Sequence, residues 1–140
     1  MNFVAKSLSE IARSCVGVSR YQLKADPHWA PSVVDCSSFT KWLFGQCGIL
    51  LPRLAFQQFH ACTELVPVEK TVGGELIFRG IGRPRGFYLN CPVLRIDHVG
   101  FVTFDRRVVH AANKHVGVIE SELVDFFEFK HSGMCAGRII

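Results

Sequence analysis

The spacing of hydrophobic residues changes once along this chain, at Val66-Pro67. Before this point apolar residues recur every three or four positions, from Phe3 to Cys15 and again from Phe39 to Cys47, which is typical of amphipathic helices. After it they alternate, as they do in half-buried strands. Helices first and antiparallel strands after them predict an α+β domain.

Turn and capping residues give approximate limits to these elements. The first helix is expected to end near Gly17. Asp35 is a good N-cap for the second helix and Gly48 a good terminator, and Pro52 opens a short third helix. Residues 19–34 and 79–95 are interpreted as loops, the latter as a long insertion with room for a short strand. Five strands are expected, at 75–78, 98–104, 107–112, 117–123 and 134–140.

Length and composition restrict the class of protein. The 140 residues suffice for one domain, residues 1–140. The net charge is +4, and the basic residues form no stripe interleaved with aromatic residues of the kind that binds nucleic acid. No apolar segment is long enough to span a membrane, and the N-terminus does not resemble a signal peptide. The six cysteines contain no CxxC pair, so a structural zinc site is not expected. We predict a monomer without a cofactor.

The stretch Asp35-Cys36-Ser37-Ser38-Phe39 points to thiol chemistry. A cysteine attacks carbonyl groups as the thiolate, and the first turn of a helix, with its unpaired N–H groups, favours that anion. We therefore expect the pKa of Cys36 to be lowered. The N–H of Cys36 would also help to form an oxyanion hole.

Two histidines follow on successive strands, in Asp97-His98-Val99-Gly100 and in Val109-His110-Ala111. A three-residue turn at 104–106 would pair His110 with Gly100 and place both imidazoles on one face, roughly 7 Å apart at the backbone. His98 would then act as the base for Cys36, and His110 would orient it.

These motifs resemble those of the NlpC-type cell-wall cysteine peptidases, which are papain-like enzymes. The resemblance covers nearly the whole chain after Arg20 and is most specific at the Cys36 and His98 motifs. The matching segments are Asp35-Cys36-Ser37-Ser38-Phe39, Gly48-Ile49-Leu50-Leu51-Pro52-Arg53, Gln58, Gly74-Glu75-Leu76-Ile77-Phe78, His98-Val99-Gly100-Phe101-Val102, Val109-His110-Ala111 and Ala136-Gly137-Arg138-Ile139.

The resemblance implies N-terminal helices packed on an antiparallel sheet. It implies hydrolysis, through a thioester, of the bond between γ-D-glutamate and a diamino acid in peptidoglycan stem peptides. The catalytic residues would be Cys36, His98 and His110. Tyr21 would lie beside the oxyanion site, and the free amino end of the stem peptide would bind near Tyr21, Asp35 and Ser37. Family members usually act at the cell envelope or outside the cell, and some act in the cytoplasm.

Two departures from the family bear on substrate choice: Tyr21-Gln22-Leu23-Lys24 replaces the usual aromatic residue and glycine, and the 79–95 loop is long. Three alternatives to the peptidase remain open. The chain could be an amidase or acyl transferase of the same fold, a non-catalytic binding module, or a protein that holds zinc with Cys36, His98 and His110.

Overall fold

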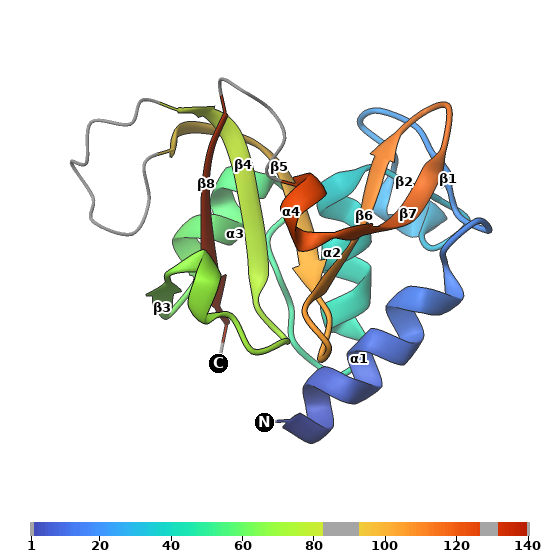
Figure 1. Ribbon diagram of the computed structural model, residues 1–140. Coiled ribbons are helices and arrows are strands. Elements are labelled where there is room, and N and C mark those ends of the chain that lie inside the picture. Colours follow the sequence, from blue (N-terminus) through green and yellow to red (C-terminus); the bar gives the residue numbers. More distant parts are fainter. Residues whose placement is uncertain (1, 83–92, 127–131, 140) are drawn as a thin grey trace.

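The computed structural model describes residues 2–82, 93–126 and 132–139, and these form a mixed helix and sheet structure (Figure 1). The α+β prediction is confirmed. The helices, including two short 3-10 helices, are α1 (Asn2–Ser14), η1 (Pro27–Trp29), α2 (Cys36–Gly45), α3 (Ala55–Ala61), η2 (Val68–Lys70) and α4 (Leu123–Phe126). The strands are β1 (Arg20–Tyr21), β2 (Val33–Val34), β3 (Glu64–Val66), β4 (Leu76–Gly82), β5 (Val93–Val102), β6 (Arg107–Asn113), β7 (Gly117–Glu122) and β8 (Ser132–Arg138).

In the part of the chain that the structure describes, the main sheet has six strands in the order β3-β8-β4-β5-β6-β7, and the pairings between its neighbours are antiparallel. It has one strand more than expected, because the three-residue strand β3 was too short to show an alternating pattern. The expectation of a loop over 79–95 is wrong where the structure describes it: β4 continues to Gly82, and β5 already begins at Val93. Residues 83–92 of that expected loop lie outside the described residues. The expected loop over 19–34 contains a two-stranded parallel sheet, β1-β2.

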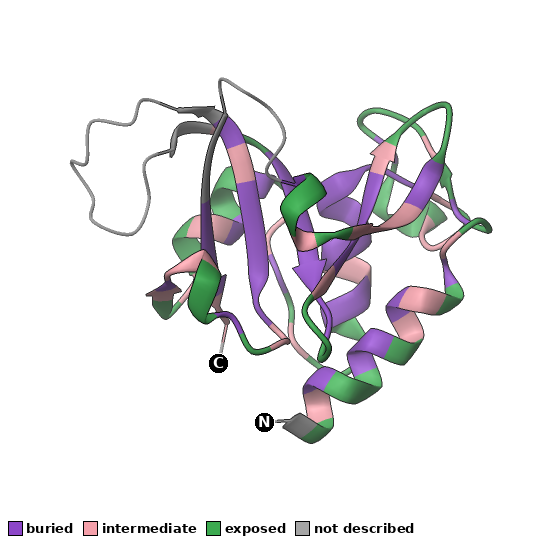
Figure 2. Ribbon diagram, in the orientation of Figure 1, coloured by how far each residue is buried: buried purple, intermediate pink, exposed green. Residues whose placement is uncertain are grey.

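Each face of the sheet has its own apolar cluster. The larger cluster joins α1, α2 and α3 to the sheet residues Phe78, Val99 and Phe101, all fully buried. The smaller one lies on the opposite face, where Phe126 of α4 packs against Val102 and neighbouring residues. The helices α2 and α3 thus cover one face and α4 the other, and the strands between them are largely buried (Figures 1 and 2).

An ion-pair network ties α1 to the far edge of the sheet. The guanidinium of Arg13 donates to Glu120 at 2.8 Å and to Asp105 at 2.7 Å. Arg107 donates to the same Glu120 and to Glu122. These partly exposed contacts each contribute little to stability, but together they fix the position of α1 along β6 and β7.

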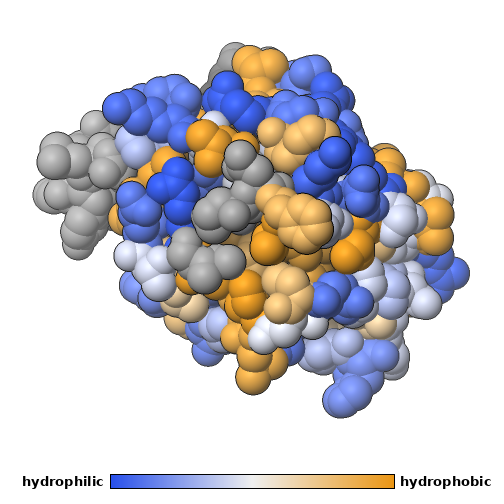
Figure 3. Space-filling model, turned by 90° about the horizontal axis from the view of Figure 1, so that it is seen from below, coloured by the Kyte–Doolittle hydropathy of each residue, from blue (hydrophilic) through white to orange (hydrophobic). Residues whose placement is uncertain are grey.

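Some exposed apolar residues lie together on one face of the molecule. On the face seen from below, several hydrophobic side chains adjoin near the middle, and hydrophilic side chains lie mostly around them (Figure 3). Exposed apolar area of this kind is common on folded proteins. Within the described ranges, no helix has the length and apolar character needed to cross a membrane.

Candidate active site

Cys36 is the first residue of α2, as the sequence predicts. Asp35 has an extended backbone and caps the helix: its Oδ1 accepts a hydrogen bond from the Ser38 N–H at 2.8 Å. In return, the Ser38 hydroxyl accepts from the Asp35 N–H at 2.9 Å. This reciprocal capping box satisfies the helix start and holds Cys36 in place.

Arg53 joins Asp35 to Ser37, the two residues expected to contact substrate. Its guanidinium donates to both carboxylate oxygens of Asp35, at 2.7 and 3.1 Å, and to the Ser37 hydroxyl at 2.9 Å. It also donates to the Ala25 carbonyl at 2.7 Å. The sequence interpretation gave Arg53 no role, although its place in Leu51-Pro52-Arg53 was a usable signal.

Gln58 fixes the backbone beneath this site. It is fully buried, and its side-chain amide donates to the Ser37 and Pro52 carbonyls, both at 2.9 Å. The Thr40 hydroxyl donates to its carbonyl oxygen at 2.6 Å. The first turn of α2 is therefore bonded through α3 to the segment that carries Arg53.

A groove of about 770 Å³ opens above these residues. Tyr21, Asp35, Cys36, Ser37 and Arg53 line it, together with Leu23, Lys24, Ala25, Asp26, Pro27, His28, Leu54, Ala55, Phe56, Ile96 and Asp97. Burial, and then the negative charges of the Cys36 thiolate and Asp35, raise the pKa of the Tyr21 phenol. Tyr21 thus keeps its proton and can donate a hydrogen bond within the groove.

Lys24 stands in the wall of this groove with a φ of 60°. This left-handed conformation is costly for residues with a side chain and free of strain for glycine. The resemblance described above implies an aromatic residue and a glycine where this chain has Tyr21-Gln22-Leu23-Lys24, and Lys24 has a conformation that favours glycine.

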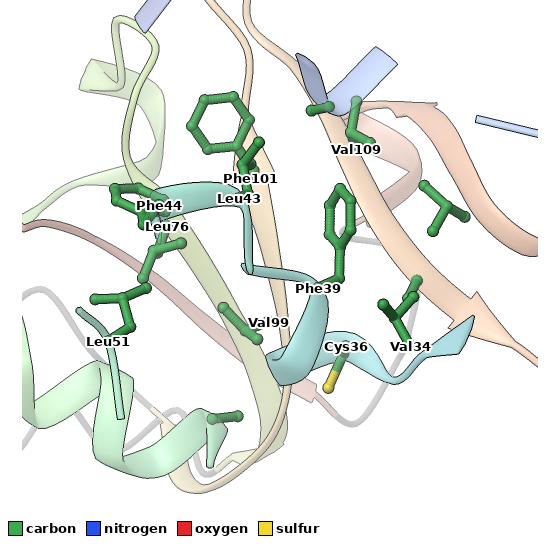
Figure 4. Close-up of a cluster of buried hydrophobic side chains, with 14 of the residues drawn as sticks. Val34, Cys36, Phe39, Leu43, Phe44, Leu51, Leu76, Val99, Phe101 and Val109 are labelled. Carbon is green, nitrogen blue, oxygen red and sulfur yellow. The ribbon is translucent and has the colours of Figure 1, made fainter. Parts of the chain in front are cut away.

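Cys36 is 9% exposed, and in Figure 4 its sulfur points away from Phe39. Burial raises the pKa of the thiol to about 11, and the main-chain N–H groups of Val99 and Ser37, which face the sulfur, offset this only in part. The prediction of a lowered pKa is therefore wrong, because the loss of water around a thiolate costs more free energy than the hydrogen bonds from two N–H groups offset.

The two histidines meet as the sequence predicts. Strands β5 and β6 pair Phe101 with Val109 and Val102 with Val108, and the turn between them closes with the Thr103 N–H bonded to the Arg107 carbonyl. This register corresponds to the three-residue turn and sets both imidazoles on one face.

The His98 Nε2 lies 2.7 Å from the His110 Nδ1, and the His110 Nε2 lies 3.4 Å from the Ser121 hydroxyl oxygen. Gly100 makes room for this pair, because a Cβ there would lie 3.2 Å from the His110 Cβ.

Both imidazoles are kept neutral by their surroundings. Burial, followed by the charges of His110 and Arg79, holds the pKa of His98 well below its ordinary 6.5. Burial and the charge of Arg79 lower the pKa of His110 to about 4. With His98 donating from Nε2 to His110, and His110 donating from Nε2 to Ser121, the Nδ1 of His98 carries a lone pair and can act as a base.

The sequence assigned no role in the site to three residues that lie near the imidazoles, namely Arg79, Ser121 and Phe126. The Phe126 ring lies 5.7 Å from the His98 ring and 5.1 Å from the His110 ring, measured between centroids. Arg79 had been assigned to a loop, and no local pattern marked the other two. Strand pairing brings Arg79 and Ser121 to the site, and the packing of α4 on the sheet brings Phe126.

Two further observations concern the alternatives of a non-catalytic binding module and of a zinc site. The Cys36 sulfur faces the N–H of the residue after His98, but over residues 2–82, 93–126 and 132–139 we find no hydrogen bond from this thiol to either imidazole. In the same ranges, no three His, Cys, Asp or Glu side chains are grouped to hold a metal ion.

Comparison with known proteins identifies the family. The model of the NlpC/P60 family matches residues 20–127, which is more than half of the chain. The chain belongs to the NlpC/P60 family. It is similar to the "Probable endopeptidase p60" of Listeria innocua, with 30% identity over 86 residues. That match covers 61% of this chain but 16% of the Listeria protein, so this chain spans only a small part of that relative.

Solved structures of NlpC/P60 members share the fold. NlpC2 from Trichomonas vaginalis matches with a TM-score of 0.75 at 17% identity, over 97% of this chain and 46% of that one. The peptidoglycan hydrolase RipB from Mycobacterium tuberculosis matches with a TM-score of 0.69 at 22% identity, over 99% of this chain and 65% of that one. At these identities the likeness shows the fold alone.

Proposed function

We propose that this NlpC/P60 domain is a cysteine peptidase that hydrolyses peptidoglycan stem peptides, at the bond between γ-D-glutamate and a diamino acid, through a thioester. The observation that carries this proposal is the hydrogen-bonded pair of His98 and His110 beside the strand segment that the Cys36 sulfur faces. The family membership and the names of the Listeria and Mycobacterium relatives support the choice of substrate.

The proposed reaction begins from a neutral thiol and a neutral imidazole. The Nδ1 of His98 takes the Cys36 proton as the sulfur attacks the scissile carbonyl carbon. The Cys36 N–H, at the start of α2, and the Tyr21 hydroxyl would donate to the oxyanion. Collapse of the intermediate breaks the C–N bond, and the leaving amine takes the proton from His98. Water then hydrolyses the thioester, which restores the thiol.

The raised pKa of Cys36 fits this general-base route better than a thiolate formed in advance. Asp35 and Ser37, which are both buried and line the groove, would receive the free amino end of the stem peptide. Because Arg53 already neutralises Asp35, the Ser37 hydroxyl and the remaining carboxylate lone pairs are the groups left for that ammonium.

The test is incubation with defined stem peptides and mass spectrometry of the products. Cys36→Ala should abolish turnover while the fold is retained. Cys47→Ala, which removes an exposed thiol, should leave turnover unchanged. Cleavage that persists in Cys36→Ala would show that the nucleophile is misassigned. Products from another acyl substrate alone would favour the amidase or acyl transferase, and a lack of any turnover would favour the binding module.

A further inference from the structure

Arg79 of β4 lies directly opposite His98 of β5 in the antiparallel ladder. Residues paired in this way project from the same face of a sheet, with their Cβ atoms about 5 Å apart. Arg79 is half-buried there. A permanent positive charge is therefore built into the sheet beside the imidazole that the proposed function uses as a base.

The ring of Phe126 connects Arg79 to both histidines. The Arg79 Cζ lies 4.7 Å from the centroid of this ring, and Nη1 donates to the Phe126 carbonyl oxygen at 3.4 Å. The same ring stacks on His98 with an interplanar angle of 26° and meets His110 edge-on at 81°. The guanidinium, the phenyl ring and the two imidazoles thus form one packed cluster.

Two titratable residues outside β4, Asp97 of β5 and Cys36 of α2, act on the charge of Arg79. Asp97 is the extra residue of a β-bulge, because the partners of Arg79 and Gly80 are His98 and Ile96. Burial lowers the pKa of Arg79, while the charges of Asp97 and of the Cys36 thiolate act in the opposite direction. Arg79 in turn lowers the pKa of both imidazoles, so its charge acts on the pair as a whole.

We propose that Arg79 is a positioning residue, which holds Phe126 against both imidazoles and, by its positive charge, adds to the burial that keeps His98 and His110 unprotonated. His98 is then ready to accept the Cys36 proton even in mildly acidic solution. This inference rests on the role given to His98 in the proposed function. It assigns a role to a strand residue that the proposed reaction does not otherwise use.

The test is an NMR titration of the histidine rings in the isotope-labelled full chain, compared with Arg79→Gln and Arg79→Lys. In wild type, both rings of the pair should titrate below the ordinary 6.5. Arg79→Gln should move both midpoints upward, so that about threefold to tenfold more of each ring is protonated at a given acidic pH. Arg79→Lys, which keeps the charge, should stay near wild type. The acid limb of kcat/KM should move with the midpoints.

Unchanged midpoints in Arg79→Gln would overturn the inference, and so would equal shifts in the two variants, which would indicate packing rather than charge. If Arg79→Gln does not fold, Arg79→Met supplies the neutral variant, and wild-type midpoints at or above 6.5 would refute the idea without any variant. The titration needs no turnover, so failure of the proposed function, seen as cleavage by Cys36→Ala, remains distinguishable.

Discussion

The ion pair between Asp35 and Arg53 should be a large contributor to the stability of the site. Asp35→Ala removes an N-cap, worth about 1 kcal/mol, and breaks a bidentate pair whose carboxylate is 9% exposed. Breaking a buried pair costs about 3–5 kcal/mol. The lower end applies here, because the Arg53 side chain is 26% exposed and keeps its bond to the Ala25 carbonyl. Asp35→Ala should therefore lower the free energy of unfolding by about 4 kcal/mol.

Urea unfolding followed by circular dichroism would measure this change. Asp35→Asn keeps the volume and the capping oxygen, but it loses the charge and replaces the oxygen that accepts from Arg53 Nη2 with an NH2 group, so it should cost about 2 kcal/mol. In a double-mutant cycle with Arg53→Gln, the coupling energy should be about 2 kcal/mol. A loss below about 1 kcal/mol in Asp35→Ala, or coupling within about 0.5 kcal/mol of zero, would refute the reasoning.

Two further predictions concern Cys36 and Gly100. Because the folded protein raises the pKa of Cys36 from 9.0 to about 11, it holds the thiol proton more tightly than the unfolded chain. This contribution to stability is fully present below pH 9 and is lost as the pH rises to about 11. Between pH 8 and 11, the free energy of unfolding of Cys36→Ser should therefore fall by about 2–3 kcal/mol less than that of wild type. An equal fall in the two proteins would contradict this prediction. Gly100→Ala would place a Cβ 2.8 Å from the Val108 Cγ1 and should cost about 1–3 kcal/mol in urea unfolding, with loss of turnover. The control Gly45→Ala, with no atom within 4 Å, should be neutral or stabilising, and equal effects of the two substitutions would show that crowding beside His110 is not the cause.

Local signals predicted much of the cysteine side of the site. Asp35 begins α2 because its carboxylate and the Ser38 hydroxyl cap the helix within four residues, and such short-range bonds are visible in sequence. The turn between β5 and β6 was also predictable, because a three-residue connection was the one that put His98 and His110 on one face. Their contact at 2.7 Å follows from that register.

Other features depended on residues far apart in the sequence. Arg79 was placed in a loop because Gly80 and Gly82 follow it, yet pairing with both β5 and β8 continues the strand through these glycines. The pKa of Cys36 was predicted in the wrong direction, because the sequence shows the helix start but not the depth of burial.

The order of apolar and capping residues along this chain was enough to set its α+β class, the start of α2 and the facing histidines, since each rests on neighbours in sequence or on one short turn. The tertiary structure alone decided the ionisation of the thiol and the place of Arg79 and Phe126 beside the imidazoles. Burial and long-range strand pairing set these properties, and both depend on the whole packed sheet.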